Sequence, residues 1–181
     1  TQCSEVGYVN NLTSHMTSQL ETLKKRLKDT KNSYHKNVYL KLRKDQQEND
    51  AFYLRFLRAR NFSKGKAMKM LVNYVSKLDE LNLYNATVND VPSVVNTNAV
   101  QFLGPDKKQR QIILITPAKH IPGSMDYKEV ERAFLMAAMI CEVTLDSPSS
   151  PTEHIALMFH YDKWSLSNVD TKVDRIFMKV G

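Results

Sequence analysis

Four side chains near the end of the chain have the residue types of hydrolytic catalysis: His154, His160, Asp162 and Ser165. An acid, a base and a hydroxyl nucleophile can perform acyl transfer together when the fold brings them into contact. However, a strand over 154–161 would place both histidines on one face, and no glycine-rich nucleophile elbow accompanies Ser165. We therefore expect these histidines to make structural hydrogen bonds.

The remaining reactive groups give no stronger indication of an enzyme or of a metal site. Cys141 and His120 could form a thiol–imidazole pair, but Cys3 is the only other cysteine, so neither a disulfide framework nor a metal cluster is indicated. The chain has 5 glycines and no glycine-rich phosphate loop. The sequence therefore predicts a non-catalytic protein that has no metal and no cofactor.

Positive charge is concentrated in the first part of the chain. The net charge is +7, and residues 20–69 hold 15 lysines and arginines against 5 acidic residues. This excess suits an anionic surface such as lipid headgroups or nucleic acid, and the alternative is a solvated helical face. The predicted helices lack the interleaved exposed aromatic residues of a specific nucleic-acid binder. Lys24, Lys25 and Lys28 are the predicted membrane-surface residues.

The elements that must position these side chains begin with a set of helices. Ser18 and Glu21 have the spacing of a capping box, which predicts a helix over 18–28. Apolar residues at helical spacing predict further helices over 37–47, 51–60 and 63–81. Residues rich in Asn, Thr, Asp, Pro and Ser predict a linker. The expected domains are a flexible tail over 1–15, a helical lobe over 16–84, the linker over 85–97 and a second lobe over 98–181.

The second lobe is predicted to alternate strands with a helix. A strand over 99–103 turns into a second strand over 111–116, which is followed by a helix over 126–145 and the strand over 154–161. A strand–helix–strand unit closes with a right-handed crossover, so the last two strands are expected to be parallel. The helix contains nine consecutive uncharged residues, Ala133 to Cys141, which is less than half the length that spans a bilayer. Such a helix must be covered on two faces, either by core or by a hydrophobic ligand.

The helical lobe carries a motif of a known family. Leu54-Arg-Phe-Leu-Arg-Ala-Arg-Asn-Phe62, followed by Lys66-Ala67 and Met70-Leu71, resembles the signature of the Sec14-like (CRAL-TRIO) lipid-binding and transfer family. Asp106–Arg110 is similar to the family's Asp-x-x-Gly-Arg hairpin, with Gln109 in place of the glycine. The resemblance covers about residues 18–181. It stops about halfway through the family's ligand-binding lobe, so that the later strands and the mobile gate helix have no counterpart here.

The resemblance implies an α/β fold in which an N-terminal helical lobe precedes an incomplete CRAL-TRIO-type lobe, with a mostly parallel sheet floor covered by helices. It implies a cytoplasmic, peripherally membrane-associated protein that binds one hydrophobic ligand and transfers it between membranes. That ligand would be a phospholipid, phosphoinositide, tocopherol-like or retinoid-like lipid. The ligand-binding residues carried over by position are Ile113, Ile115, Phe134, Ala138, Cys141, Ile155, Leu157 and Phe159.

The expected partners are the lipid and, transiently, an anionic membrane surface, with no nucleic acid. An alternative is a non-catalytic membrane- or protein-interaction module whose cavity is filled, in which case the same residues are simply core. The open edge of a partial sheet also predicts completion by further chain, self-association through that edge, or poor solubility.

Overall fold

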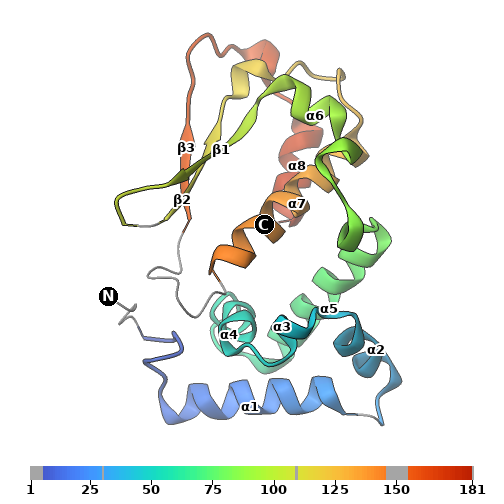
Figure 1. The fold of residues 1–181 in the computed structure, drawn as a ribbon, viewed down its shortest axis with the longest axis vertical. Helices are drawn as coiled ribbons and strands as arrows, with labels where there is room; N and C mark the ends of the chain where they lie inside the picture. Colours follow the sequence, from blue (N-terminus) through green and yellow to red (C-terminus); the bar gives the residue numbers. More distant parts are fainter. Residues whose placement is uncertain (1–5, 30, 109, 146–154, 181) are drawn as a thin grey trace. The chain divides into compact units, whose positions relative to one another are not determined.

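A computed structural model describes residues 6–29, 31–108, 110–145 and 155–180 of the chain (Figure 1). Gln109 and His154, which were singled out above, lie outside these residues. Contacts divide the chain into two compact units, Thr1–Glu80 and Leu81–Gly181, and each is described by itself. Within the described ranges, no helix combines the length and the apolar character needed to cross a bilayer. The domain boundaries drawn from the sequence remain predictions.

The first unit is helical throughout. Its helices are α1 (Ser14–Lys28), α2 (Ser33–Lys41), α3 (Lys44–Gln47), α4 (Asp50–Arg58) and α5 (Lys64–Glu80). Helices α1, α4 and α5 contact one another, and each gives one apolar stripe to a shared core. The core residues that are almost completely buried include Leu20, Leu23, Leu27, Phe52, Leu54, Leu57, Leu71 and Val75.

Two helix boundaries predicted for this unit were wrong. Helix α1 begins at Ser14, because the Thr13 hydroxyl accepts a hydrogen bond from the Met16 N–H and caps the helix one turn before Ser18. The helix predicted over 37–47 is two helices, since Leu42 has an extended backbone and the Gln46 side chain accepts from the Arg43 N–H to start α3. Both differences arise from side-chain caps that compete with helical periodicity.

The second unit combines three strands with helices. Its elements are η1 (Leu83–Asn85), η2 (Val88–Asp90), α6 (Pro92–Thr97), β1 (Val100–Pro105), β2 (Gln111–Ile115), η3 (Pro117–Lys119), α7 (Tyr127–Leu145), β3 (Ala156–Phe159), η4 (Leu166–Asn168) and α8 (Thr171–Val180). Helix α6 lies in the segment for which the sequence predicts a linker. It is joined to α7 because Ser93 donates from both its hydroxyl and its backbone N–H to the Glu129 carboxylate.

The α/β class predicted from the sequence is confirmed, but the sheet is mixed rather than mostly parallel. The strand order is β1-β2-β3, with β1 antiparallel to β2 and β2 parallel to β3. The antiparallel pair exists because a short turn joins β1 to β2, closed by a hydrogen bond from the Asp106 N–H to the Arg110 carbonyl. Helix α7 makes the longer crossover that leaves β3 parallel to β2 (Figure 1).

Candidate functional site

The sheet brings four of the predicted ligand-binding residues onto one face. Ile113 pairs with Leu157 and Ile115 pairs with Phe159 in the parallel ladder. Side chains paired across neighbouring strands point to the same side of a sheet, and residues two apart along a strand share that side. Ile155 immediately precedes β3 and continues the same alternation. We refer to Ile113, Ile115, Leu157 and Phe159 as the apolar sheet face.

The apolar sheet face is unevenly covered. Ile113 in the central strand is buried and Ile115 is half-buried, whereas Leu157 and Phe159 in β3 are each 46% exposed. Helices α7 and α8 lie side by side (Figure 1). The structure thus presents the β3 end of this face as open apolar surface, where burial against a hydrophobic ligand would be favourable.

On α7, the three predicted residues lie on one side of the helix, because they are spaced four and three residues apart. Cys141 is buried, and Phe134 and Ala138 are half-buried. The Phe134 ring meets that of Phe177 on α8 edge to face, with 5.5 Å between the centroids. Phe159 instead stacks on Tyr161 at 6.0 Å. Phe134 and Phe159, the two aromatic residues among the predicted ligand-binding residues, therefore have different ring partners.

The structure also contains a hollow that the sequence did not predict. It has a volume of about 550 Å³, and all of its lining residues belong to the first unit. The guanidinium of Arg58 lies over the Tyr8 ring at 3.9 Å and donates to the Gly7 carbonyl. None of the predicted ligand-binding residues lines this hollow, which is bordered by Val6, Tyr8, His15, Met16, Arg58, Asn61 and Phe62.

A buried carboxylate connects three parts of the second unit. The Asp170 side chain is 5% exposed and lies 3.0 Å from His120 Nε2, and its Oδ2 also accepts from the Tyr127 hydroxyl at 3.1 Å. Its Oδ1 accepts from the N–H groups of Lys172 and Val173, so that Asp170 caps α8. We name Asp170, His120 and Tyr127 the Asp170 node. It ties the segment after β2, the start of α7 and the start of α8 to one another.

Burial and hydrogen bonding shift the pKa of the Asp170 carboxyl in opposite directions. Burial acts to raise the pKa of Asp170, but the hydrogen bonds from His120, from the two backbone N–H groups and from Tyr127 outweigh it. The pKa therefore lies below its ordinary value of 3.8. A helix cap could have been read from an aspartate just before an amphipathic stretch. The contacts with His120 and Tyr127 span 50 and 43 residues of sequence, and no local pattern predicts them.

Two of the side chains considered for catalysis, His120 and Ser165, are held in structural contacts. His120 Nε2 lies 3.0 Å from the Asp170 carboxylate, so this imidazole is engaged in a structural pair and not with Cys141. The Ser165 hydroxyl lies 2.6 Å from that of Ser167 and also donates to the Asn168 side chain. His160, Asp162 and Ser165 are all exposed.

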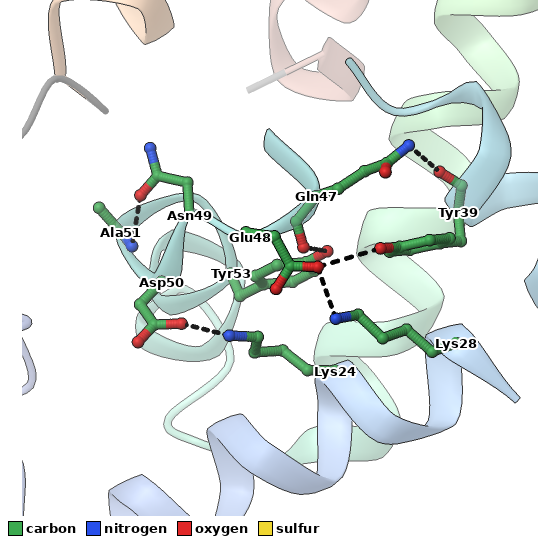
Figure 2. Close-up of polar contacts among 9 residues, drawn as sticks. All are labelled: Lys24, Lys28, Tyr39, Gln47, Glu48, Asn49, Asp50, Ala51 and Tyr53. Atoms are coloured by element: carbon green, nitrogen blue, oxygen red, sulfur yellow. Dashed lines mark hydrogen bonds and ion pairs between the residues drawn. The ribbon is translucent and has the colours of Figure 1, made fainter. Parts of the chain in front are cut away.

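Two of the three predicted membrane-surface lysines are engaged in ion pairs (Figure 2). Lys24 Nζ lies 2.7 Å from Asp50 Oδ1, and Lys28 Nζ lies 2.6 Å from Glu48 Oε1. The hydrogen bond with Glu48 raises the pKa of Lys28, and the same bond lowers the pKa of Glu48. Lys25 is exposed and does not contribute to these pairs. A paired lysine attracts an anionic surface less than an unpaired one, so we expect Lys24 and Lys28 to contribute less to such a surface than Lys25.

We expect Lys24→Ala to destabilise the first unit by about 1 kcal/mol, because its ammonium is paired with Asp50 and its side chain is only 16% exposed. Lys25→Ala is the matched control on the next residue of α1, and it should leave stability unchanged. Urea unfolding followed by far-UV circular dichroism measures both. Equal midpoints for the two variants would show that the Lys24–Asp50 pair does not stabilise the unit.

The fold defines a class of protein in which a helical unit precedes an α/β unit whose mixed sheet has exposed apolar residues at β3. Two family models match the chain: the CRAL/TRIO N-terminal domain over residues 19–73 and the CRAL/TRIO domain over residues 95–180. The chain therefore belongs to the CRAL/TRIO family, whose members bind or transfer lipophilic ligands and are typically non-catalytic. A comparison with curated proteins found no match.

Proposed function

We propose that this protein is a non-catalytic lipid carrier of the cytoplasm, which binds one hydrophobic molecule and transfers it between membranes. The observation that supports this proposal is the apolar sheet face, where Leu157 and Phe159 are open to solvent beside the buried Ile113. The ligand would lie against this face and against the side of α7 that carries Phe134, Ala138 and Cys141, with Ile155 extending the sheet side.

The energetics explain why a carrier needs such a surface. Each buried methylene contributes about 0.8 kcal/mol, so a chain of about 16 carbons resists leaving a bilayer for water by roughly 12 kcal/mol. A protein can extract the molecule only by offering a compartment about as apolar as the membrane. The free energy of moving the lipid from the bilayer to the protein is then close to zero. In this step the lipid replaces the water that contacts the exposed residues of β3.

The two faces of β3 allow a sharp test of this proposal. Leu157 and its neighbour Met158 are similarly exposed, at 46% and 51%, but alternation places them on opposite faces of the sheet. A carboxylate placed against an apolar ligand loses its hydration, so Leu157→Glu should lower the amount of bound lipid about tenfold or more. Met158→Glu makes the same chemical change on the other face and should retain the lipid.

The measurement is mass spectrometry of the lipid extracted from each purified variant, supported by the transfer of fluorescent phospholipid between vesicles. Lipid retained by Leu157→Glu, or lost equally from both variants, would contradict the proposed site.

A second candidate function is an interaction module that keeps the fold and has no room for a ligand. The edge-to-face contact of Phe134 with Phe177 and the burial of Cys141 favour it, because these apolar side chains already have protein neighbours. Unaltered protein that yields no lipid on extraction, and that transfers none between vesicles, would support the module over the carrier.

A further inference from the structure

An exposed apolar tip lies beyond the carboxyl ends of β2 and β3. Leu166 is 81% exposed and Ile121 is 65% exposed, although both belong to segments that contact each other through η3 and η4. Large aliphatic side chains that are this exposed, when they lie together, are typical of an interaction surface. Four exposed apolar residues of these segments form the surface that we name the Leu166 tip: Ile121, Trp164, Leu166 and Val169.

Hydrogen bonds hold the two segments of the Leu166 tip together. The Asn168 side-chain amide donates to the carbonyls of Ala118 at 3.3 Å and His120 at 2.9 Å, and so joins the two segments. The Ser124 hydroxyl donates to the Ile121 carbonyl at 2.6 Å, which closes the turn after Ile121. His120 also belongs to the Asp170 node, so the node and these contacts are connected. The apolar side chains are therefore presented by an ordered framework.

Aromatic residues continue the tip toward β3. The rings of Phe159 and Tyr161 stack with an interplanar angle of 13°, and Tyr161 meets Trp164 edge to face at 84°. All three are exposed. Tyr and Trp combine an apolar ring with a polar group, and both are enriched where a bilayer meets water. The composition of this surface therefore suits the boundary between lipid headgroups and acyl chains.

Exposed lysines, with the exposed Asp162 among them, belong to the segments that form the tip or to residues next to them. Lys119, Lys163 and Lys172 are exposed. The Lys119 ammonium donates to the Asn98 carbonyl, and that of Lys172 lies 4.9 Å from the centroid of the Tyr127 ring. Both partners are neutral, so the charges are not cancelled, in contrast to Lys24 and Lys28 of the first unit.

We propose that the Leu166 tip is a membrane-docking surface, which inserts Leu166 and Ile121 among the headgroups of an anionic bilayer while the three lysines bind lipid phosphates. A protein partner is less suited to this surface, because lysine is depleted in protein interfaces, whereas each lysine near an anionic leaflet is favourable. The inference deepens the membrane-transfer part of the proposed function and rests on it. It assigns the contact to the second unit instead of to Lys24, Lys25 and Lys28.

The chain carries its own reporter for this contact. Trp164 is the only tryptophan and belongs to the tip. Adding vesicles of phosphatidylcholine with phosphatidylserine should shift its emission to the blue, and lipids that carry a doxyl quencher near the headgroup should quench it. Pure phosphatidylcholine vesicles should give a weaker response. Co-sedimentation with anionic vesicles without any change in Trp164 emission would overturn the proposal, because the protein would then bind elsewhere. Absence of binding to both kinds of vesicle would also overturn it.

Paired substitutions separate the tip from general effects of charge. Burying a leucine side chain in a membrane accounts for about tenfold or more in partitioning, so Leu166→Glu should lower the fraction bound to anionic vesicles by at least that factor. Leu40→Glu is the matched control, because Leu40 is 62% exposed on α2 and the change in net charge is identical. Equal binding by Leu166→Glu and unaltered protein, or equal losses in both variants, would overturn the proposal.

The same assays distinguish failure of this inference from failure of the carrier function. Leu157→Glu should lose lipid but keep the blue shift of Trp164, which shows that the shift comes from the bilayer and not from a bound ligand. Loss of the shift in that variant would overturn the assignment. Protein that carries no extractable lipid but shows the Trp164 response would keep the docking surface and lose the carrier function.

Discussion

Leu57→Ala is expected to destabilise the first unit by about 3 kcal/mol, because it removes a fully buried side chain and leaves a cavity. Leu57 lies on α4, in the core where that helix meets α1 and α5, and all three helices give buried leucines to the same cluster. Neighbouring side chains in such a core cannot relax enough to fill the lost volume. The measurement is the free energy of unfolding in urea, followed by far-UV circular dichroism.

Leu40→Ala is the control for this experiment. It makes the same chemical change on α2, at a side chain that is 62% exposed, and should alter the free energy of unfolding by less than about 0.5 kcal/mol. Similar losses for the two leucines would mean that the helical core does not determine the stability of the unit.

Asp170→Ala is expected to destabilise the second unit by about 3 kcal/mol, because it removes a buried carboxylate and leaves the hydrogen-bonding groups of His120 and Tyr127 unsatisfied. It also removes the cap of α8. Trp164 lies a few residues away, so its fluorescence during urea unfolding reports on this unit. Asp162→Ala, at an exposed aspartate of the same segment, should leave the transition unchanged. A midpoint for Asp170→Ala equal to that of the control would contradict a structural role for the node.

The node also makes a prediction about pH. The folded state holds the pKa of Asp170 below its ordinary value of 3.8, so the unfolded chain takes up a proton first as the pH falls. The contribution of Asp170 to stability is therefore complete above the unfolded pKa and is lost as the pH drops through the folded pKa. Asp170→Asn cannot ionise, and its stability should vary less over this acidic range than that of the unaltered protein.

Periodicity and chain order predicted much of this fold. The apolar spacing in α4 and α5 identified buried faces that include Phe52, Leu57 and Leu71. The rule for strand–helix–strand units predicted that β3 lies parallel to β2, and the register confirms it. These successes share a cause, since burial of one face and the handedness of a crossover depend on local sequence and on general geometry.

The parts that could not be predicted depend on particular long-range partners. Periodicity places Lys24 beside the apolar stripe of α1, but its partner Asp50 is 26 residues away and belongs to another helix. His120 and Asp170 are even farther apart in sequence. At the candidate site, the register aligns Ile113 with Leu157, whereas the pairing of Phe134 with Phe177 depends on how α7 and α8 pack. A single sequence shows which residues could make such contacts, but it does not show which residue pairs with which.

Strand β3 has a further consequence for how the chain reaches its native state. Its four residues, Ala156 to Phe159, are all apolar, so neither side of the strand is marked by polarity as the outer one. If β3 were displaced by one residue along β2, apolar side chains would still be buried. Each side chain of β3 would then lie on the opposite face of the sheet. Little in the strand itself therefore corrects a misaligned intermediate. In the native register the ladder continues one step beyond β3, where the His160 N–H donates to the Ile115 carbonyl.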